Sequence, residues 1–148
     1  METSDFLQAD DIYKMILVPF AVENEFKTDD EIERFIGVDS AGRQGRYYRL
    51  AAEKFGLVFN ENNLSSLTVR GKFFVTLQND NSKISFIASI MRETEVFAQA
   101  IKYLESSNSR PDLMNLKDWF IRSYPGSENT AERRFSTFVK YLHATGFI

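Results

Sequence analysis

Three arginines, Arg43, Arg46 and Arg49, recur at three-residue spacing near the middle of the chain. Wound as a helix, this stretch places them on one face and gathers apolar and aromatic side chains on the opposite arc: Tyr47, Tyr48, Ala51, Ala52 and Phe55. A guanidinium group makes forked hydrogen bonds to guanine edges and to phosphates. The pattern therefore fits a helix that packs with one side and contacts double-stranded DNA with the other, although a solvated basic face would have the same spacing.

The charges of the chain are unevenly distributed. The formal net charge of the 148 residues is −3. Residues 1–39 carry eleven acidic and three basic side chains, whereas residues 40–74 carry six basic and two acidic ones. Because nucleic-acid affinity depends on the local basic patch, the acidic flank does not exclude DNA binding. It predicts moderate, salt-sensitive affinity.

The elements expected to position the arginines form a helix-turn-helix. A first helix is predicted over Asp11–Val22, and a second, short helix begins after Thr28. Thr28 and Glu31 have the spacing of a capping box, and Ile32, Phe35 and Ile36 supply its apolar face. A turn over residues 39–42 then leads into the arginine helix, which Gly56 ends.

A short β-hairpin is predicted directly after this motif, over about residues 57–69. Two extended pieces flank the polar cluster Asn60–Asn63, and such a pair following a helix-turn-helix is typical of a wing. Thr68 is positioned to cap a following helix that runs through Leu77. The expected fold class is mainly α, with winged helix-turn-helix units.

The second half of the chain repeats the pattern of the first. The sequence predicts a linker at residues 79–82, helices over 83–92, 95–105, 112–124 and 129–145, and a break at 106–109. A shift of ninety residues places Gly146 on Gly56 and Arg133 on Arg43. The final helix has Phe135, Phe138 and Leu142 on its inner face and Arg133, Ser136, Lys140 and His143 on its outer face. We expect tandem units over 1–78 and 79–148, the second truncated where its wing would begin, as at the boundary of a fragment.

The pattern resembles a winged-helix family found in restriction endonucleases and related uncharacterised bacterial proteins. The residues that carry the resemblance are Asp29–Glu33, Arg43–Arg49 followed by Ala51 and Ala52, Phe55–Leu57, and Leu67–Thr68 with Gly71–Lys72. The segment from Thr130 to Ile148 is similar to the second winged helix of such proteins. The resemblance implies sequence-specific recognition of double-stranded DNA on behalf of a nuclease or another effector that this chain does not contain.

No arrangement of residues indicates that the chain is an enzyme by itself. Glu25 and Lys27 have the spacing of a nuclease metal motif, but they fall at a helix end and not on a strand. His143 has no serine or carboxylate partner at a telling spacing, and no metal-ligand cluster or phosphate-binding glycine loop is found. We expect no cofactor. Without cysteine, a signal peptide or an apolar run long enough to span a bilayer, a cytoplasmic protein that does not enter membranes is expected.

The predicted DNA contacts come from the basic helix, the wing region and the final helix. They are Arg43, Gln44, Arg46, Tyr47, Arg49, Lys54, Arg70, Lys72, Arg133, Arg134, Ser136 and Lys140. Arg43 and Arg46 are expected near base edges, with Arg49 and Lys54 at phosphates. Two alternatives stay open: a winged-helix module for protein interaction or dimerisation, which could form a homodimer, and a free-standing transcriptional regulator.

Overall fold

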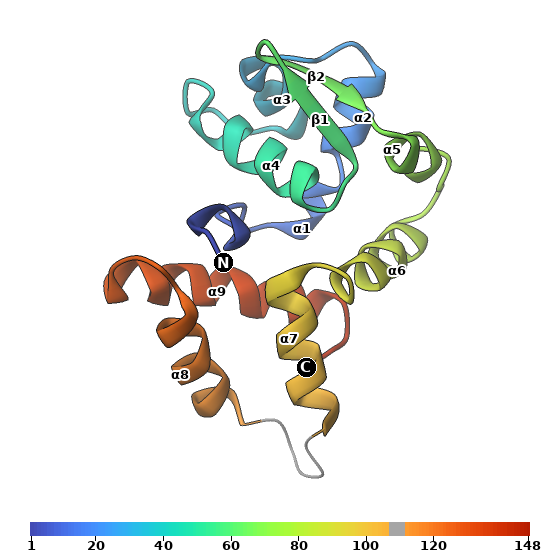
Figure 1. Cartoon of the computed structure of the whole chain (residues 1–148). Helices are drawn as coiled ribbons and strands as arrows, with labels where there is room; N and C mark the ends of the chain where they lie inside the picture. Colours follow the sequence, from blue (N-terminus) through green and yellow to red (C-terminus); the bar gives the residue numbers. More distant parts are fainter. Residues whose placement is uncertain (107–111) are drawn as a thin grey trace.

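The computed structural model describes residues 1–106 and 112–148, and in this part the chain is mainly helical with one small two-stranded sheet (Figure 1). The expected break at 106–109 lies outside the described residues except for Ser106, which ends a helix. The elements are η1 (Thr3–Asp5), α1 (Ile12–Met15), α2 (Val18–Glu23), α3 (Asp29–Ile36), α4 (Arg43–Lys54), β1 (Val58–Glu61), β2 (Leu64–Leu67), α5 (Val69–Phe74), α6 (Asp80–Met91), α7 (Glu95–Ser106), α8 (Leu113–Ser123) and α9 (Glu128–Ala144). The mainly helical class expected from the sequence is confirmed.

The single helix expected over Asp11–Val22 is two short helices. Asp11 caps α1 by accepting a hydrogen bond from the N–H of Tyr13, and α2 starts after Leu17 with Pro19 in its first turn. Proline lacks the N–H that an uninterrupted helix would need, and its ring disfavours helical backbone before it. Residues 16 and 17 accordingly form a turn between α1 and α2.

α3 begins after Thr28 and α4 ends just before Gly56, as the sequence predicts. Thr28 accepts a hydrogen bond from the N–H of Glu31, and Glu31 closes the capping box. α3 ends at Gly37 and α4 is followed by Gly56, both in the left-handed conformation that glycine adopts without steric cost. The two helices pack against each other, joined by the turn at residues 39–42.

The predicted hairpin is present. β1 and β2 pair antiparallel, with Glu61 opposite Leu64. The connecting residues Asn62 and Asn63 have φ values of 54° and 63°, as in the two-residue turns whose twist matches that of the strands. The N–H of Ser65 also bonds to the carbonyl of Lys27 at 2.9 Å, which attaches the hairpin to the segment before α3.

α5 follows the hairpin, capped as predicted by Thr68, but residues 79–82 are not the expected linker. Asn79 accepts a hydrogen bond from the N–H of Ser82 at 2.8 Å and caps α6, which starts at Asp80. This segment is a helix start because Asn79, a good capping residue, precedes an apolar helical pattern. The remaining predicted helices agree with α6 to α9 within a few residues.

The ends of α4 and α9 have the same backbone geometry, ninety residues apart. The N–H of Leu57 bonds to the carbonyl of Ala52 at 2.9 Å, and the N–H of Phe147 bonds to that of Leu142 at 2.9 Å. Gly56 and Gly146 both have positive φ, at 71° and 82°. The repeat seen in the sequence thus corresponds to a repeated helix end. After it the chain differs, since Val58 starts β1 whereas Phe147 and Ile148 form no strand.

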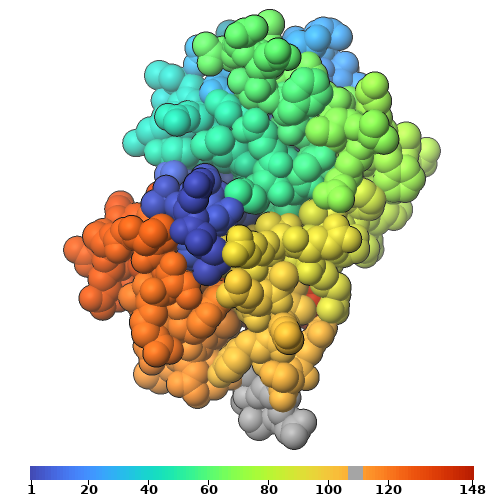
Figure 2. Space-filling view, in the orientation of Figure 1, coloured from blue at the N-terminus to red at the C-terminus, as the bar shows by residue number. Residues whose placement is uncertain are grey.

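The two halves share one hydrophobic core. Phe55 of the first half stacks on Tyr141 of α9 with ring centroids 6.0 Å apart, and Phe6 meets Phe120 of α8 edge-to-face at 5.1 Å. In the space-filling view the dark-blue N-terminal residues sit between the α4 region and the orange α8–α9 region (Figure 2). The division at residues 78 and 79 stays a prediction, but the halves are packed together. Within the described residues, no helix combines the length and the apolar character needed to cross a membrane.

Candidate nucleic-acid interface

The start of α4 is held by a carboxylate from α3. Gly42, the residue before α4, has no side chain to cap the helix, and Glu33 supplies the missing acceptor. Its carboxylate accepts hydrogen bonds from the backbone N–H groups of Gly42, Gln44 and Gly45 at 2.8, 3.2 and 3.3 Å. It also accepts bonds from the N–H and hydroxyl of Ser40. One buried side chain therefore orders both the turn and the first turn of α4.

These hydrogen bonds keep Glu33 ionised. Only 3% of the residue is exposed, and burial by itself would raise the pKa of its carboxyl group. The hydrogen bonds from the Ser40 hydroxyl and from the backbone of Gly42, Ser40 and Gly45 outweigh burial and lower the pKa to about 2. The carboxylate at the positive end of the α4 dipole is thus charged throughout the physiological range.

Gly45 lets α4 approach α3 closely. A Cβ at this position would lie 2.1 Å from the carbonyl oxygen of Asp29 and 2.9 Å from the Cβ of Glu33. Only a residue without a side chain fits this contact. The orientation of α4 is therefore fixed at its beginning by Glu33 and Gly45, a role that was not predicted for either residue.

Arg43 and Arg46 lie on the exposed face of this anchored helix. Both are exposed, and neither forms an ion pair within the described part of the chain. Gln44 is partly buried, with its N–H bonded to Glu33 and to the Ser40 hydroxyl. Tyr47 is also partly buried, beside Arg43 and Arg46. Tyr48 is buried, and its hydroxyl accepts the N–H of Asp11 at 3.1 Å, as expected for the inner face.

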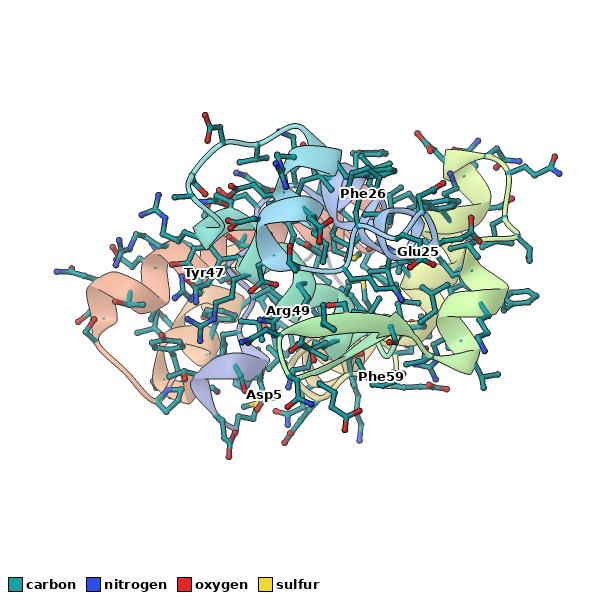
Figure 3. The ribbon with its side chains drawn as sticks, turned by 90° about the horizontal axis from the view of Figure 1, so that it is seen from above. Asp5, Glu25, Phe26, Tyr47, Arg49 and Phe59 are labelled. Carbon is teal, nitrogen blue, oxygen red and sulfur yellow. The ribbon has the colours of Figure 1, made fainter. Side chains whose placement is uncertain are left out.

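Arg49, which is expected at a phosphate, is paired within the chain. Its guanidinium makes two hydrogen bonds to Asp29, at 2.9 and 3.0 Å, and one to Glu53 at 3.0 Å, and the side chain is only 13% exposed. The hydrogen bond to Asp29 raises the pKa of Arg49 above its ordinary value. In Figure 3 Arg49 lies among other side chains near the centre of the view. It joins α4 to α3.

Lys54 and Arg70, which are also expected to contact DNA, form ion pairs within the chain as well. The ammonium group of Lys54 lies 2.5 Å from the carboxylate of Asp5. Burial would raise the pKa of Asp5, but the hydrogen bond from Lys54 lowers it below its ordinary value. Arg70 donates to the carbonyl of Phe55 at 3.1 Å, which caps the end of α4, and pairs with Glu93 at 3.5 Å. Lys72, by contrast, is exposed and has no ion pair among the described residues.

The predicted residues of α9 are divided between two surfaces. Arg133, Ser136 and Lys140 are exposed on the outer face, as predicted, and Lys140 lies 3.6 Å from the carboxylate of Asp10. Arg134 turns instead toward the first half of the molecule. Its Nε–H is buried and has no hydrogen-bond partner among the described residues.

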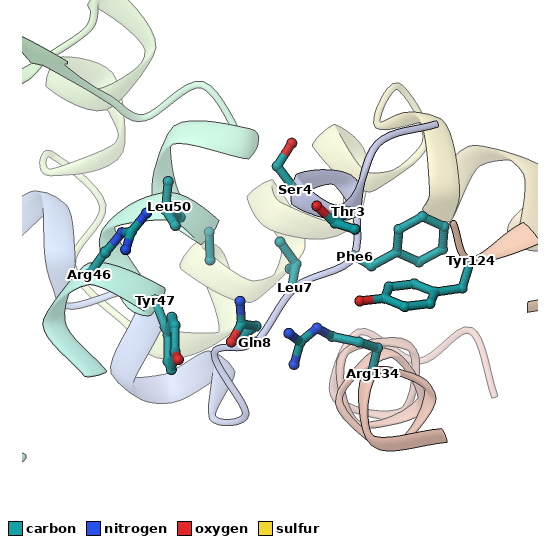
Figure 4. A pocket seen from close by; sticks show the side chains of 11 residues that line it. Thr3, Ser4, Phe6, Leu7, Gln8, Arg46, Tyr47, Leu50, Tyr124 and Arg134 are labelled. Carbon is teal, nitrogen blue, oxygen red and sulfur yellow. The ribbon is translucent and has the colours of Figure 1, made fainter. Parts of the chain in front are cut away.

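A cleft of about 370 Å³ separates the start of α4 from α8 and α9. Arg46 and Tyr47 come from one side of it and Tyr124 and Arg134 from the other, with Gln8 of the N-terminal segment between them (Figure 4). The cleft thus joins residues that the sequence analysis assigned to two separate units. Residues of the segment 3–8 also line the cleft. This part of the lining could not be predicted, because no pattern in the sequence indicates that the segment packs near α4 and α9.

The residues considered as catalytic candidates in the sequence lie at the surface. Glu25 and Lys27 form an exposed ion pair, 3.1 Å apart, in the turn between α2 and α3. His143 is exposed on α9. Across residues 1–106 and 112–148, no group of three or more His, Cys, Asp or Glu side chains is placed to hold a metal ion.

Comparison with known proteins places the chain in a family that is described as a domain of unknown function. The model of a domain of unknown function, DUF7226, matches residues 15–143, so the chain belongs to this family. No curated protein and no solved structure matches the chain. The matched region runs from α1 to α9 and includes both halves.

Proposed function

We propose that this member of the DUF7226 family binds double-stranded DNA, with α4 in the major groove. The observation that carries the proposal is the pair of exposed guanidinium groups of Arg43 and Arg46, which form no ion pair with any residue that the structure describes, on a helix whose start is fixed by Glu33. A rigid support keeps such groups in place, and arginine is the side chain best suited to guanine edges.

In this arrangement α3, the turn and α4 act as a helix-turn-helix, and the β1–β2 hairpin lies beside it as a wing. Arg43 and Arg46 contact base edges, and Lys72 contacts the phosphate backbone of the flanking DNA. Arg49, Lys54 and Arg70 shape the protein and do not contact phosphates. Because Arg49, Lys54 and Arg70 are already paired with acidic side chains, we expect moderate affinity that falls steeply with salt concentration.

The resemblance of residues 28–72 to winged helices of restriction endonucleases supports a more specific proposal. The chain would supply target recognition to a nuclease, and another domain or subunit would cut the DNA. The second repeat, with Arg133 and Ser136 exposed on α9, would contact an adjacent part of the duplex or orient the first repeat.

A mobility-shift titration tests DNA binding. The protein is titrated into a pool of random duplexes at about 50 and 200 mM salt, and bound duplexes are selected and sequenced. The Arg43→Ala/Arg46→Ala variant should lose the selected binding. A matched variant, Lys102→Ala/Arg122→Ala, removes the same charge from α7 and α8 and should keep it. Equal loss in both variants would exclude a specific role of α4.

A second candidate function, a protein-interaction module, is favoured by α5. Val69 and Phe73 are 86% and 54% exposed on this short helix. The groove beside Gly42 is lined by Asp29 and Asp30 as well as by the arginines, which suits a partner of mixed charge better than a phosphate backbone. No duplex binding at low salt, together with concentration-dependent dimerisation in sedimentation that a Phe73→Ser change abolishes, would establish this alternative in place of DNA binding.

A further inference from the structure

The cleft between α4 and α9 has a composition that differs from the rest of the surface. Eleven residues line it: Thr3, Ser4, Phe6, Leu7, Gln8, Arg46, Tyr47, Leu50, Ala51, Tyr124 and Arg134. None of them is acidic, although the chain has 21 acidic residues and a net charge of −3. The only charged side chains in the lining are two arginines, so the cleft favours an anion.

The two guanidinium groups come from opposite walls, as Figure 4 shows. Arg46 is exposed and has no ion pair among the described residues. Arg134 is partly buried, and its Nε–H is an orphan donor in the structure described here. Arg134 lines the cleft and has no ion pair among the described residues, so its charge is available to an anion bound there. Two separated cations suit a ligand with more than one negative charge.

The remaining lining is both polar and apolar. Thr3, Ser4 and Gln8 offer hydroxyl and amide groups, whereas Leu7 and Leu50 provide apolar surface. Tyr47 and Tyr124 add aromatic rings. A volume of about 370 Å³ is in the range of small-molecule sites, which combine a mostly apolar wall with a few polar groups.

We propose that this cleft binds a small phosphorylated organic ligand of nucleotide size, with its anionic groups between Arg46 and Arg134. The ring of Tyr47 and the side chain of Leu50 face its organic body, and the N-terminal segment donates hydrogen bonds to it. This site does not depend on the proposed DNA contact. It shares Arg46 with that contact but uses neither Arg43 nor the hairpin.

Isothermal titration with adenosine 5′-diphosphate tests the proposal, with adenosine and inorganic phosphate as comparison probes. The full chain should bind the diphosphate, with adenosine and phosphate each at least about tenfold weaker, because each lacks one part of the ligand. Arg134→Gln should weaken binding of the diphosphate at least about tenfold, since the positive charge on that wall of the cleft is removed. Arg133→Gln, the exposed neighbour on α9, is the matched control and should bind as the unchanged protein does.

Two further variants keep the test decisive. Arg46→Gln changes an exposed residue and should also weaken diphosphate binding. It replaces Arg134→Gln in the test if circular dichroism shows that Arg134→Gln does not fold. Arg43→Gln should weaken DNA and leave the diphosphate unaffected, which separates failure of this site from failure of DNA binding. Absence of diphosphate binding at about 1 mM protein and ligand, where millimolar affinity is measurable, would overturn the proposal. Binding that both Arg134→Gln and Arg46→Gln leave unchanged would overturn it as well.

Discussion

The carboxylate of Glu33 accepts the backbone N–H of Gly42 at 2.8 Å, across the turn that joins α3 to α4. A helix that starts after a glycine has no capping side chain of its own, and here the preceding helix supplies it from nine residues earlier. The orientation of the helix that carries Arg43 and Arg46 thus depends on a residue outside that helix.

Replacing Glu33 with glutamine should destabilise the protein by about 1–3 kcal/mol, because an amide accepts fewer and weaker hydrogen bonds than the carboxylate it replaces. The free energy of unfolding in urea measures this. Glu23→Gln, at the exposed end of α2, is the control and should change stability little. If both variants unfold at the same urea concentration, Glu33 does not hold α4.

The contribution of Glu33 should also depend on pH. Its pKa is about 2 in the folded protein and near the ordinary 4.5 in the unfolded chain. The unfolded chain therefore binds a proton first as the pH falls, and the stabilisation present above pH 4.5 is lost progressively toward pH 2. Urea titrations at several pH values should show the difference between wild type and Glu33→Gln shrinking across this range. A difference that stays constant from neutral pH to pH 2 would contradict the assignment.

Gly45→Ala should destabilise the fold by about 1–3 kcal/mol, although the same change inside an ordinary helix stabilises it by about 0.5–1 kcal/mol. The added Cβ would lie 2.1 Å from the carbonyl oxygen of Asp29, so α3 and α4 must move apart. Thermal unfolding measures the effect, with Ser136→Ala on the exposed face of α9 as the control. A stabilised Gly45→Ala variant would show that the two helices are not in close contact.

Alanine substitution should affect stability much more at Arg49 than at Arg43. Arg49→Ala removes hydrogen bonds to Asp29 and Glu53 and should lower stability by about 1–2 kcal/mol. Arg43→Ala, at an exposed position, should change stability by less than about 0.5 kcal/mol. Urea unfolding of the two variants under identical conditions gives the comparison. Equal stabilities would mean that the ion pairs of Arg49 contribute nothing.

Replacing Arg43 and Arg46 together with alanine should leave the fold intact. It should weaken the free energy of specific DNA binding by roughly 1–3 kcal/mol for each arginine–base contact that is lost. The affinity for a selected duplex, measured by fluorescence anisotropy, gives this value directly. Far-ultraviolet circular dichroism confirms that the helical content is retained. An unfolded double variant would instead assign both arginines a structural role.

Local signals in the sequence were sufficient for much of the fold. Thr28, Asn62, Asn63 and Thr68 act within a few residues of themselves, and the caps and the hairpin turn that they predict are present. Helical periodicity also placed Tyr48 inside and Arg43 outside. These features could be predicted because their physical causes lie within one or two turns of the chain.

The partners of the cations could not be predicted in the same way. A helical projection places Arg49 and Lys54 outside, but it carries no information on which acidic side chain another element brings near. Asp5 lies 49 residues before Lys54, and Glu93 belongs to the loop between α6 and α7, in the other half from Arg70. The candidate interface is therefore smaller than the sequence predicted, and the cleft beside it was missed.

The position of Phe6 also affects how the protein is made. Its aromatic partners, Phe120 and Tyr124, follow it by more than a hundred residues. On the ribosome Phe6 emerges long before α8, yet its packing surface exists only after α8 has been synthesised. The docking of Phe6 onto Phe120 and Tyr124 should therefore come late in folding, and this long-range closure should be slow relative to the local pairing of α3 and α4.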